Sequence, residues 1–384
     1  MRYLTSGESH GPCLNAIIEG FPSGVEIKED FINAELAKRQ AGYGRGGRMK
    51  IETDKAAILS GVRFGVTTGA PICIEIGNKD WENWTIPMSP SPISEENQPL
   101  ADDKKITALR PGHADLAGAK KYNQNDIRNI LERSSARETT TRVAVGAFSK
   151  TLLEYFGTNI FSHVIQIGSV KAPETAKTYE EIKSTADQSE MRCADAQTEQ
   201  QMKELIDQAK EKGDSLGGYF EVIITNAPIG LGSFVHWDRK LDGLFAQAIM
   251  SIPAVKSIEI GAGIKSAELS GAKMHDEIHT GLKRPTNNAG GIEGGMSNGE
   301  PIIIKAAMKA IPTMMTPLKS VDLATGEEHL AHVERADVCA VPACAIVAEA
   351  MAANVLASVF LDKFGGDSLH EIETNYKNYL EQIK

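Results

Sequence analysis

The sequence has few cysteines and few aromatic residues, and it lacks the usual signals of secretion and membrane insertion. Its five cysteines are scattered and form no C-x-x-C pair, which excludes a disulfide framework and a zinc knuckle and is typical of a reducing compartment. The N-terminus has no apolar core of a signal peptide. The most apolar stretch, residues 340–361, contains Glu349 and Asn354 and therefore predicts a buried core helix rather than a membrane span. We expect a cytoplasmic protein.

An excess of positive charge is also absent. The 384 residues carry a net charge of −10, which argues against nucleic acid or an anionic membrane as a partner. Arginines that cluster in such a chain indicate a local pocket for a small anion.

Several well-known motifs are missing or incomplete. There is no P-loop, and no histidine or carboxylate spacing typical of a metal site, so no metal is expected. Residues 7–11, G-E-S-H-G, fit the nucleophile elbow of serine hydrolases, but Pro12 and a predicted strand follow where that motif needs a helix. Residues 42–47, G-Y-G-R-G-G, fit the dinucleotide fingerprint, but the predicted helix comes before them and the strand after. Both functions are therefore disfavoured.

Polar chemistry is densest between residues 110 and 142. Ser135 and Glu138 have the spacing of a capping box, which predicts a helix beginning near Ala136. Arginines surround this helix start, whose N–H groups and hydroxyls could hold a phosphate or a carboxylate. An ordinary capped helix with a solvated charged face explains the pattern almost as well.

The order of elements predicts an α+β fold with antiparallel sheet, in one domain spanning residues 1–384, because strands come in groups with few helices between them. The predicted strands are residues 1–6, 14–19, 49–52, 57–62, 71–76, 159–170, 219–225, 255–260 and 301–305. The predicted helices are residues 31–39, the one after 135, 199–212, 241–252, 342–364 and the one after Ser368. Residues 78–107 and 271–299 are expected to be long loops, the first a candidate lid. Residues 171–196 are hard to assign.

A second group of arginines lies in a glycine-rich turn. Arg39, Arg45 and Arg48 flank or interrupt the glycines of residues 42–47. Guanidinium groups bind carboxylates and phosphates in bidentate pairs, and glycines let a backbone approach a ligand closely. A solvated basic turn is the alternative.

Three further side chains are candidates for acid–base chemistry. His10 and His113 lie in turns flanked by glycine, although most loop histidines are structural. Asp337 precedes the predicted core helix, where a cap or an ion pair is the alternative.

Together, these motifs resemble those of the chorismate synthase family, and the resemblance runs from residue 1 to about residue 364. Any one block would be weak evidence, but many in the right order are specific. The blocks are G-E-S-H-G-P at 7–12, R-Q-A-G-Y-G-R-G-G-R-M-K-I-E at 39–52, R-P-G-H-A-D at 110–115, E-R-S-S-A-R-E-T at 132–139, T-N-N-A-G-G-I-E-G-G-M-S-N-G at 286–299 and V-E-R-A-D-V at 333–338.

The resemblance implies a fold and a reaction. The fold would be a β-α-β sandwich with helices between antiparallel sheets, assembled as a homotetramer. The reaction would be the 1,4-anti elimination of phosphate from 5-enolpyruvylshikimate-3-phosphate to give chorismate, with reduced FMN required. The arginines fit a substrate with a phosphate and two carboxylates, and the glycine-rich loops fit a flavin.

The resemblance also implies residue roles. His10 would protonate the departing phosphate, His113 would lie beside the flavin and help to hold its reduced form, and Asp337 would take part in removing the ring proton. The implied substrate and phosphate ligands are Arg39, Arg45, Arg48, Arg110 and Arg137. The implied FMN-binding residues are Arg133, Ser134, Ser135, Pro253, Ala254, Gly294, Lys309, Ala310, Ile311, Pro312, Thr313 and Arg335.

Some expectations stay open at this point. Pro253 stands where the family usually has asparagine, which leaves a side-chain contact to the flavin in doubt. The reduced FMN could come from the chain's own use of NADPH or from a separate reductase, and the lack of a dinucleotide fingerprint favours the second. A non-catalytic flavoprotein that binds phosphate is the alternative function.

Overall fold

The computed structural model describes residues 1–46, 53–174, 177–334 and 336–384. Within these ranges the strands form a four-stranded sheet, a five-stranded sheet and three two-stranded ribbons, and all the strand pairs are antiparallel. The predicted class, mixed helix and antiparallel sheet, is confirmed.

The first sheet comes from the N-terminal part of the chain. Its strands lie in the order β1 (Arg2–Ser6), β2 (Cys13–Glu19), β6 (Ile72–Gly77) and β3 (Ala57–Ile58). Burial alternates along β2 and β6, so each strand buries one face. Residues 7–12 are the loop that connects the paired strands β1 and β2. G-E-S-H-G therefore joins two strands and cannot be a nucleophile elbow, which needs a helix after the serine.

The second sheet is more deeply buried. Its strands lie in the order β10 (Val255–Ile260), β13 (Ile302–Met308), β9 (Gly218–Thr225), β7 (Asn159–Ile167) and β8 (Val170–Lys171). The ribbons pair β4 (Val62–Arg63) with β5 (Val66–Thr67), β11 (Ile292–Glu293) with β12 (Met296–Ser297), and β14 (Lys319–Val321) with β15 (Glu328–Leu330).

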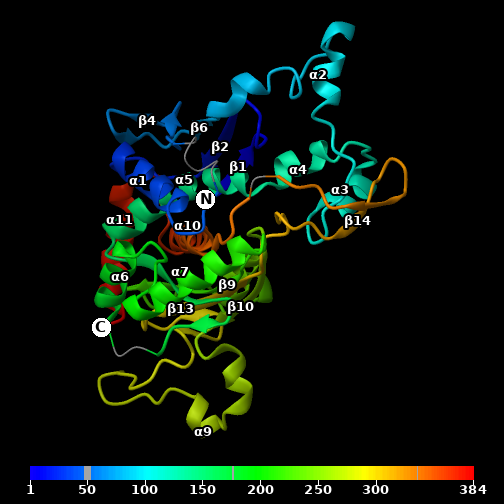
Figure 1. The fold of residues 1–384 in the computed structure, drawn as a ribbon. Coiled ribbons are helices and arrows are strands. Elements are labelled where there is room, and N and C mark those ends of the chain that lie inside the picture. Colours follow the sequence, from blue (N-terminus) through cyan, green and yellow to red (C-terminus); the bar gives the residue numbers. More distant parts are fainter. Residues whose placement is uncertain (47–52, 175–176, 335) are drawn as a thin grey trace.

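Two helices occupy the centre of the molecule. α5 (Thr139–Tyr155) packs against α10 (Val341–Phe364) and touches the first sheet, while α10 touches β7 and β9 of the second sheet (Figure 1). α1 (Glu29–Gln40) and α8 (Leu241–Met250) also pack on α10. Of the helices that the structure describes, only α10 is long and apolar enough to cross a membrane. Because 83% of its most apolar window is buried inside the protein, we interpret it as a core helix.

The remaining helices lie outside this centre. Figure 1 shows α2 and α9 projecting from opposite ends of the molecule. These peripheral helices are α2 (Gln98–Asp102), α3 (Asp115–Tyr122), α4 (Arg128–Ser134), α6 (Tyr179–Gln188), α7 (Ala196–Glu211), α9 (Gly271–Met274) and α11 (Leu369–Gln382).

Some local predictions need correction. The predicted strand 57–62 is two short strands separated by a turn. The helix after Ser135 starts with a 3₁₀ turn over residues 136–138, in which the Ser135 hydroxyl accepts from the Arg137 N–H. The capping box is incomplete, because the Glu138 side chain pairs with Arg142 instead. Residues 171–196, left unassigned, contain α6, which begins with a complete capping box. The predicted strand 49–52 lies outside the described residues.

Candidate active site

A cavity of about 440 Å³ opens where several loops meet at one end of α5 and α10. Its walls come from the β1–β2 loop, the end of α1 and the turn after it, the segment before α3, the α4–α5 junction, the α8–β10 turn, the segment after β13 and the segment before α10. The chain folds this way because both central helices begin here, which brings segments far apart in sequence to the same helix ends. The cavity therefore draws on most of the blocks singled out in the sequence.

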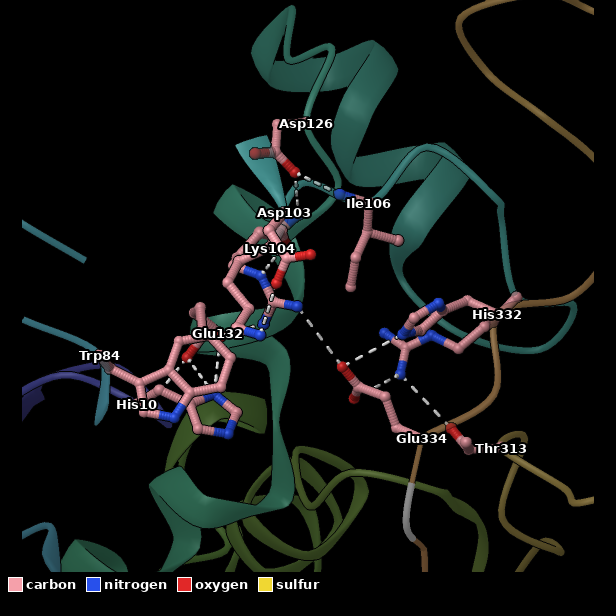
Figure 2. A network of polar contacts seen from close by, with 12 residues as sticks. His10, Trp84, Asp103, Lys104, Ile106, Asp126, Glu132, Thr313, His332 and Glu334 are labelled. Atoms are coloured by element: carbon pink, nitrogen blue, oxygen red, sulfur yellow. Dashed lines mark hydrogen bonds and ion pairs between the residues drawn. The ribbon is translucent and has the colours of Figure 1, made fainter. Parts of the chain in front are cut away.

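His10 lies on one wall of the cavity. Its Nδ1 is 2.8 Å from Glu132 Oε1, and its backbone N–H donates to Glu132 Oε2 at 2.8 Å (Figure 2). Burial disfavours the charged form of Glu132, but the hydrogen bonds and charge of His10, aided by Arg128, outweigh it and lower the pKa of Glu132. With Glu132 accepting from Nδ1–H, the Nε2 atom of His10 is the ring nitrogen left for a ligand.

His113 lies on another wall, within a compact group that also contains Arg110 and Asp115. Arg110 Nε donates to Asp115 at 2.9 Å, and Arg110 Nη2 lies 3.1 Å from His113 Nδ1. His113 Nδ1 also contacts Asp115, which is fully buried. Burial opposes ionisation of Asp115, but the hydrogen bonds from His113 and Arg110 prevail and hold the pKa of Asp115 at about 2.

Glu334 is a carboxylate inside this mostly cationic cavity. It lies 3.8 Å from Arg110, 3.7 Å from Arg128 and 3.3 Å from His332 (Figure 2). The hydrogen bond from His332 is the main cause that holds the pKa of Glu334 at about 2; burial opposes it, and the two arginines add to it. Since Arg128 also binds Glu132, a chain of charged groups runs from the His10 wall to the His113 wall.

Arg39 and Arg137 share one buried acid, Asp54. Arg137 Nη1 donates to Asp54 Oδ1, and Arg39 Nη1 lies 3.6 Å from Asp54 Oδ2. Arg39 Nη1 and Asp54 Oδ2 are both buried without a hydrogen-bond partner among the described residues. Burial lowers the pKa of Arg39 to about 10, so it stays charged near neutral pH.

Asp337 and Arg45 form a third charged group on the cavity wall. The Gly46 N–H donates to Asp337 Oδ1 at 2.6 Å, and Arg45 Nη1 lies 3.2 Å from Asp337 Oδ2. These two contacts fix the orientation of a carboxylate that faces the cavity.

Most of the residues predicted from the sequence line this one cavity. They are His10, His113, Asp337, Arg39, Arg45, Arg110, Arg137, Ser134, Ser135, Pro253, Ala254, Lys309, Ile311, Pro312 and Thr313. The remaining predicted residues are elsewhere or cannot be placed. Ala310 does not line the cavity, and Arg48 and Arg335 lie outside the described residues.

Two predicted flavin residues lie apart from the cavity. Arg133 donates instead to the carbonyls of Thr5 and Gly7 at the end of β1. Gly294 lies in the β11–β12 turn, beside the start of α8, while Ala254 follows the end of that helix. Ten residues of helix separate the two ends, a length of about 15 Å.

Comparison with known proteins decides the family. Residues 1–361 match the family model of chorismate synthase. The chorismate synthase of Geobacter metallireducens is 52% identical over all of this chain and 99% of its own length, and that of Desulforamulus reducens is 51% identical with the same coverage. A solved chorismate synthase structure aligns with a TM-score of 0.79 at 41% identity, over 100% of this chain and 98% of that one. The chain belongs to the chorismate synthase family.

Its activity follows from that membership. A chorismate synthase is a lyase that eliminates phosphate from 5-enolpyruvylshikimate-3-phosphate to give chorismate, the last common step of the shikimate pathway, on which aromatic amino-acid biosynthesis depends. The resemblance seen in the sequence is confirmed.

The acidic partners of the cavity were not anticipated. Asp54, Glu132, Asp115 and Glu334 are the carboxylates that orient the predicted arginines and histidines. Three of them lie inside the blocks that carry the resemblance to chorismate synthase, so their position was a signal. A buried cation needs an anion, and the block R-P-G-H-A-D places Asp115 two residues after His113.

Proposed function

We propose that this cavity binds the substrate and reduced FMN together and is where phosphate leaves. The observation that carries the proposal is the convergence of four arginines, a lysine and both histidines on one cavity. The substrate's phosphate and carboxylates are the anionic groups that guanidinium forks recognise best.

Arg39 fits an anionic ligand because its own acid does not satisfy it. Arg39 Nη1 is buried and lacks a hydrogen-bond partner in the described part of the chain. A buried donor without a partner costs about 1–3 kcal/mol, more when it is charged, and an anionic oxygen of the ligand would remove that cost. Arg45 and Arg137 lie near Arg39, since the charge of each lowers the pKa of Arg39, and we assign all three to the substrate.

Reduced FMN fits the other part of the cavity. Ser134 and Ser135 offer hydroxyls at the junction of α4 and α5, and Met308, Ile311 and Pro312 offer apolar surface for a planar ring. Lys309, Thr313, Pro253 and Ala254 would complete the site in this subunit, whereas Arg133 and Gly294 lie outside its cavity. When bound, the reduced flavin supplies an electron-rich ring beside the substrate.

His10 is the general acid in this proposal. Glu132 holds Nδ1, so Nε2 is the atom that gives a proton to the departing phosphate. Glu132 also stabilises the protonated ring by its charge, and its lowered pKa keeps it ionised near neutral pH.

His113 and Asp337 are assigned to the other two roles. His113, fixed by Asp115 and Arg110, places a positive or donor group where a reduced flavin would carry negative charge. Asp337, fixed by Gly46 and Arg45, is a carboxylate in position to take part in removal of the ring proton.

The proposal extends to the whole chain. We infer a single domain and a β-α-β sandwich, supported by one hydrophobic cluster that includes residues of both sheets and of the helices between them. By family likeness we also propose a homotetramer in the cytoplasm, supplied with reduced FMN by a separate reductase. Light scattering that gave the 41.4 kDa of one chain would contradict the tetramer. NADPH oxidation coupled to turnover by the purified chain would contradict the separate reductase.

An anaerobic assay tests the central proposal. Substrate is added with dithionite-reduced FMN, and chorismate and phosphate are followed together. We expect equal amounts of the two products, and no turnover with oxidised FMN. Turnover that does not depend on flavin would overturn the proposed cofactor.

A further inference from the structure

The indole of Trp84 lies flat against the ring of His10. The two ring centroids are 4.0 Å apart and the planes differ by 27° (Figure 2). Trp84 ends a 3₁₀ turn in the excursion 78–107, which the sequence marked as a candidate lid and which the proposed function does not use. A stacked ring that close to a proposed acid must influence how that acid sits.

The groups that surround the indole are bound to one another. Arg128 Cζ lies 4.8 Å from the Trp84 ring centroid. Glu132 Oε1 accepts from Arg128 at 2.9 Å and is 2.8 Å from His10 Nδ1, so it joins both groups. Both the imidazole and the guanidinium therefore rest against the same indole while a single carboxylate ties them together.

The turn that carries Trp84 is fixed to the loop that carries His10. Trp84 Nε1–H donates to Asp80 at 2.9 Å. At the start of the turn, the Asn78 side chain donates to the carbonyls of Glu8 and Gly11 at 3.2 and 2.7 Å. Those carbonyls lie on either side of His10 in the sequence, so the indole and the imidazole belong to one hydrogen-bonded unit.

We propose that Trp84 is a positioning residue for the elimination of phosphate, which acts by fixing the plane of the His10 ring. The inference rests on the proposed role of His10 as the acid. Glu132 holds one edge atom of the imidazole, and a ring held at one edge can still tilt. Stacking on the indole removes that tilt and keeps Nε2 aimed at the cavity, and proton transfer depends on such alignment.

The test removes the ring and then restores part of it. Trp84→Leu should lower kcat about tenfold, a part of the ~10²–10⁴-fold that a positioned acid contributes. The KM for substrate and the affinity for FMN should change less than twofold, and Trp84→Phe should recover most of kcat. Trp81→Leu is the matched control, because Trp81 belongs to the same turn and none of the ring contacts found among the described residues involves it. A loss shared by KM and flavin affinity, or an equal loss in Trp81→Leu, would overturn the inference.

A double-mutant cycle separates positioning from a merely structural role. If Trp84 acts through His10, adding Trp84→Leu to His10→Gln should leave kcat unchanged. Independent, multiplying losses would refute the positioning role while leaving the acid role intact. Full activity of His10→Gln alone would instead refute the acid role, and with it the inference.

A spectroscopic measurement keeps the idea testable if Trp84→Leu does not fold. In the variant Trp81→Phe/Trp237→Phe, Trp84 is the only tryptophan left, since the chain has three. Its emission should change when His10 is replaced by glutamine and should stay the same when His113 is replaced. Trp84 emission that is the same with and without the His10 replacement would show that the two rings do not stack in solution.

Discussion

Two clusters of charge in this molecule both pair carboxylates with basic side chains but are completed to different degrees. The helix-layer cluster consists of Glu35, Lys150, Arg192 and Glu349, and it joins α1, α5 and α10. Lys150 Nζ lies 2.5 Å from both glutamates, and Glu349 Oε1 accepts from Arg192 at 3.2 Å. In this cluster only Arg192 Nε lacks a partner among the described residues.

The cavity cluster consists of Arg39, Asp54, Arg110, Arg137 and Glu334. Two of its ion pairs are long, at 3.6 Å for Arg39–Asp54 and 3.8 Å for Arg110–Glu334, and the link from Glu334 to Arg128 outside the cluster is 3.7 Å. Arg39 and Asp54 each keep a buried polar atom without a hydrogen bond in the described part of the chain.

The difference separates a charge cluster that holds the fold together from one that we propose binds a ligand. Burying charge is costly unless hydrogen bonds satisfy it, so a complete cluster is stable alone. An incomplete cluster keeps donors ready for an anion, at a cost in stability to the empty protein. Variants in the cavity should therefore change chemistry, and variants in the helix layer should change stability.

The largest effect is expected at His10. His10→Ala removes the proposed acid and should lower kcat by about 10²–10⁴-fold, with FMN affinity and the urea midpoint little changed. Steady-state kinetics with reduced FMN, flavin titration and urea unfolding measure the three quantities. Full activity would refute the acid role, and a large loss of stability would show that His10 mainly stabilises the fold.

Lys150→Met should show the opposite pattern. It leaves Glu35 and Glu349 buried together without their shared cation, which typically costs about 3–5 kcal/mol of unfolding free energy. Lys38→Met is the matched control, because Lys38 binds the same Glu35 from a part-exposed position and an exposed pair contributes about 1 kcal/mol or less. Equal losses in the two variants would contradict our account of the helix-layer cluster.

Many residues that line the candidate site could be picked from the sequence because they lie in short, recognisable blocks. His10, His113, Asp337 and the described arginines of the proposed substrate site all line the cavity. The carboxylates that orient them were missed, because pairing across the fold depends on distances that one sequence does not contain. Asp54 and Arg137 are far apart in the chain and meet only when α5 is in place.

The same limit explains the errors in the fold. β7 and α10 were predicted well because their apolar patterns are long and continuous. The pattern of 57–62 is apolar too, but Gly61 has φ +80° and a Cβ there would lie 2.6 Å from Ile72, so the chain turns at this glycine and forms two short strands instead of one. Ser135 and Glu138 have the spacing of a capping box, but Glu138 forms an ion pair with Arg142 instead. Spacing alone does not reveal that a second partner competes for the glutamate.

His113→Ala should weaken catalysis through the flavin. A hydrogen bond to a charged group contributes about 1.5–3 kcal/mol, so kcat should fall about ten- to hundredfold. The spectrum and reduction potential of bound FMN should also shift, whereas His10→Ala should leave both unchanged. A shift caused by His10→Ala alone would mean that the two roles are reversed.

The helix-layer cluster should also make stability depend on acid. Burial opposes ionisation of Glu35, but Lys150 and Lys38 prevail and hold its pKa at about 2, against an ordinary 4.5. As the pH falls, Glu35 therefore takes up a proton in the unfolded chain before it does so in the folded protein. The contribution of Glu35 to the unfolding free energy is complete above pH 4.5 and is lost as the pH falls towards 2. The unfolding free energy obtained from urea titrations across that window should fall less steeply for Glu35→Gln, by on the order of 3 kcal/mol in total. Identical slopes would show that Glu35 is not held ionised.

The smallest effect is expected at Glu334, and it is the sharpest test of the comparison. Its pKa is also about 2, yet its side chain is 32% exposed and its arginine partners are 3.7–3.8 Å away. A part-exposed pair of this kind contributes about 1 kcal/mol or less, so Glu334→Gln should scarcely change the urea midpoint. Removing its charge should instead free Arg110 for the substrate and lower KM modestly, by about twofold. The amide keeps the shape of the side chain and its contact with His332, so a change in KM would report charge alone. If Glu334→Gln destabilises the protein as strongly as Lys150→Met does, both clusters stabilise the fold and the distinction between them fails.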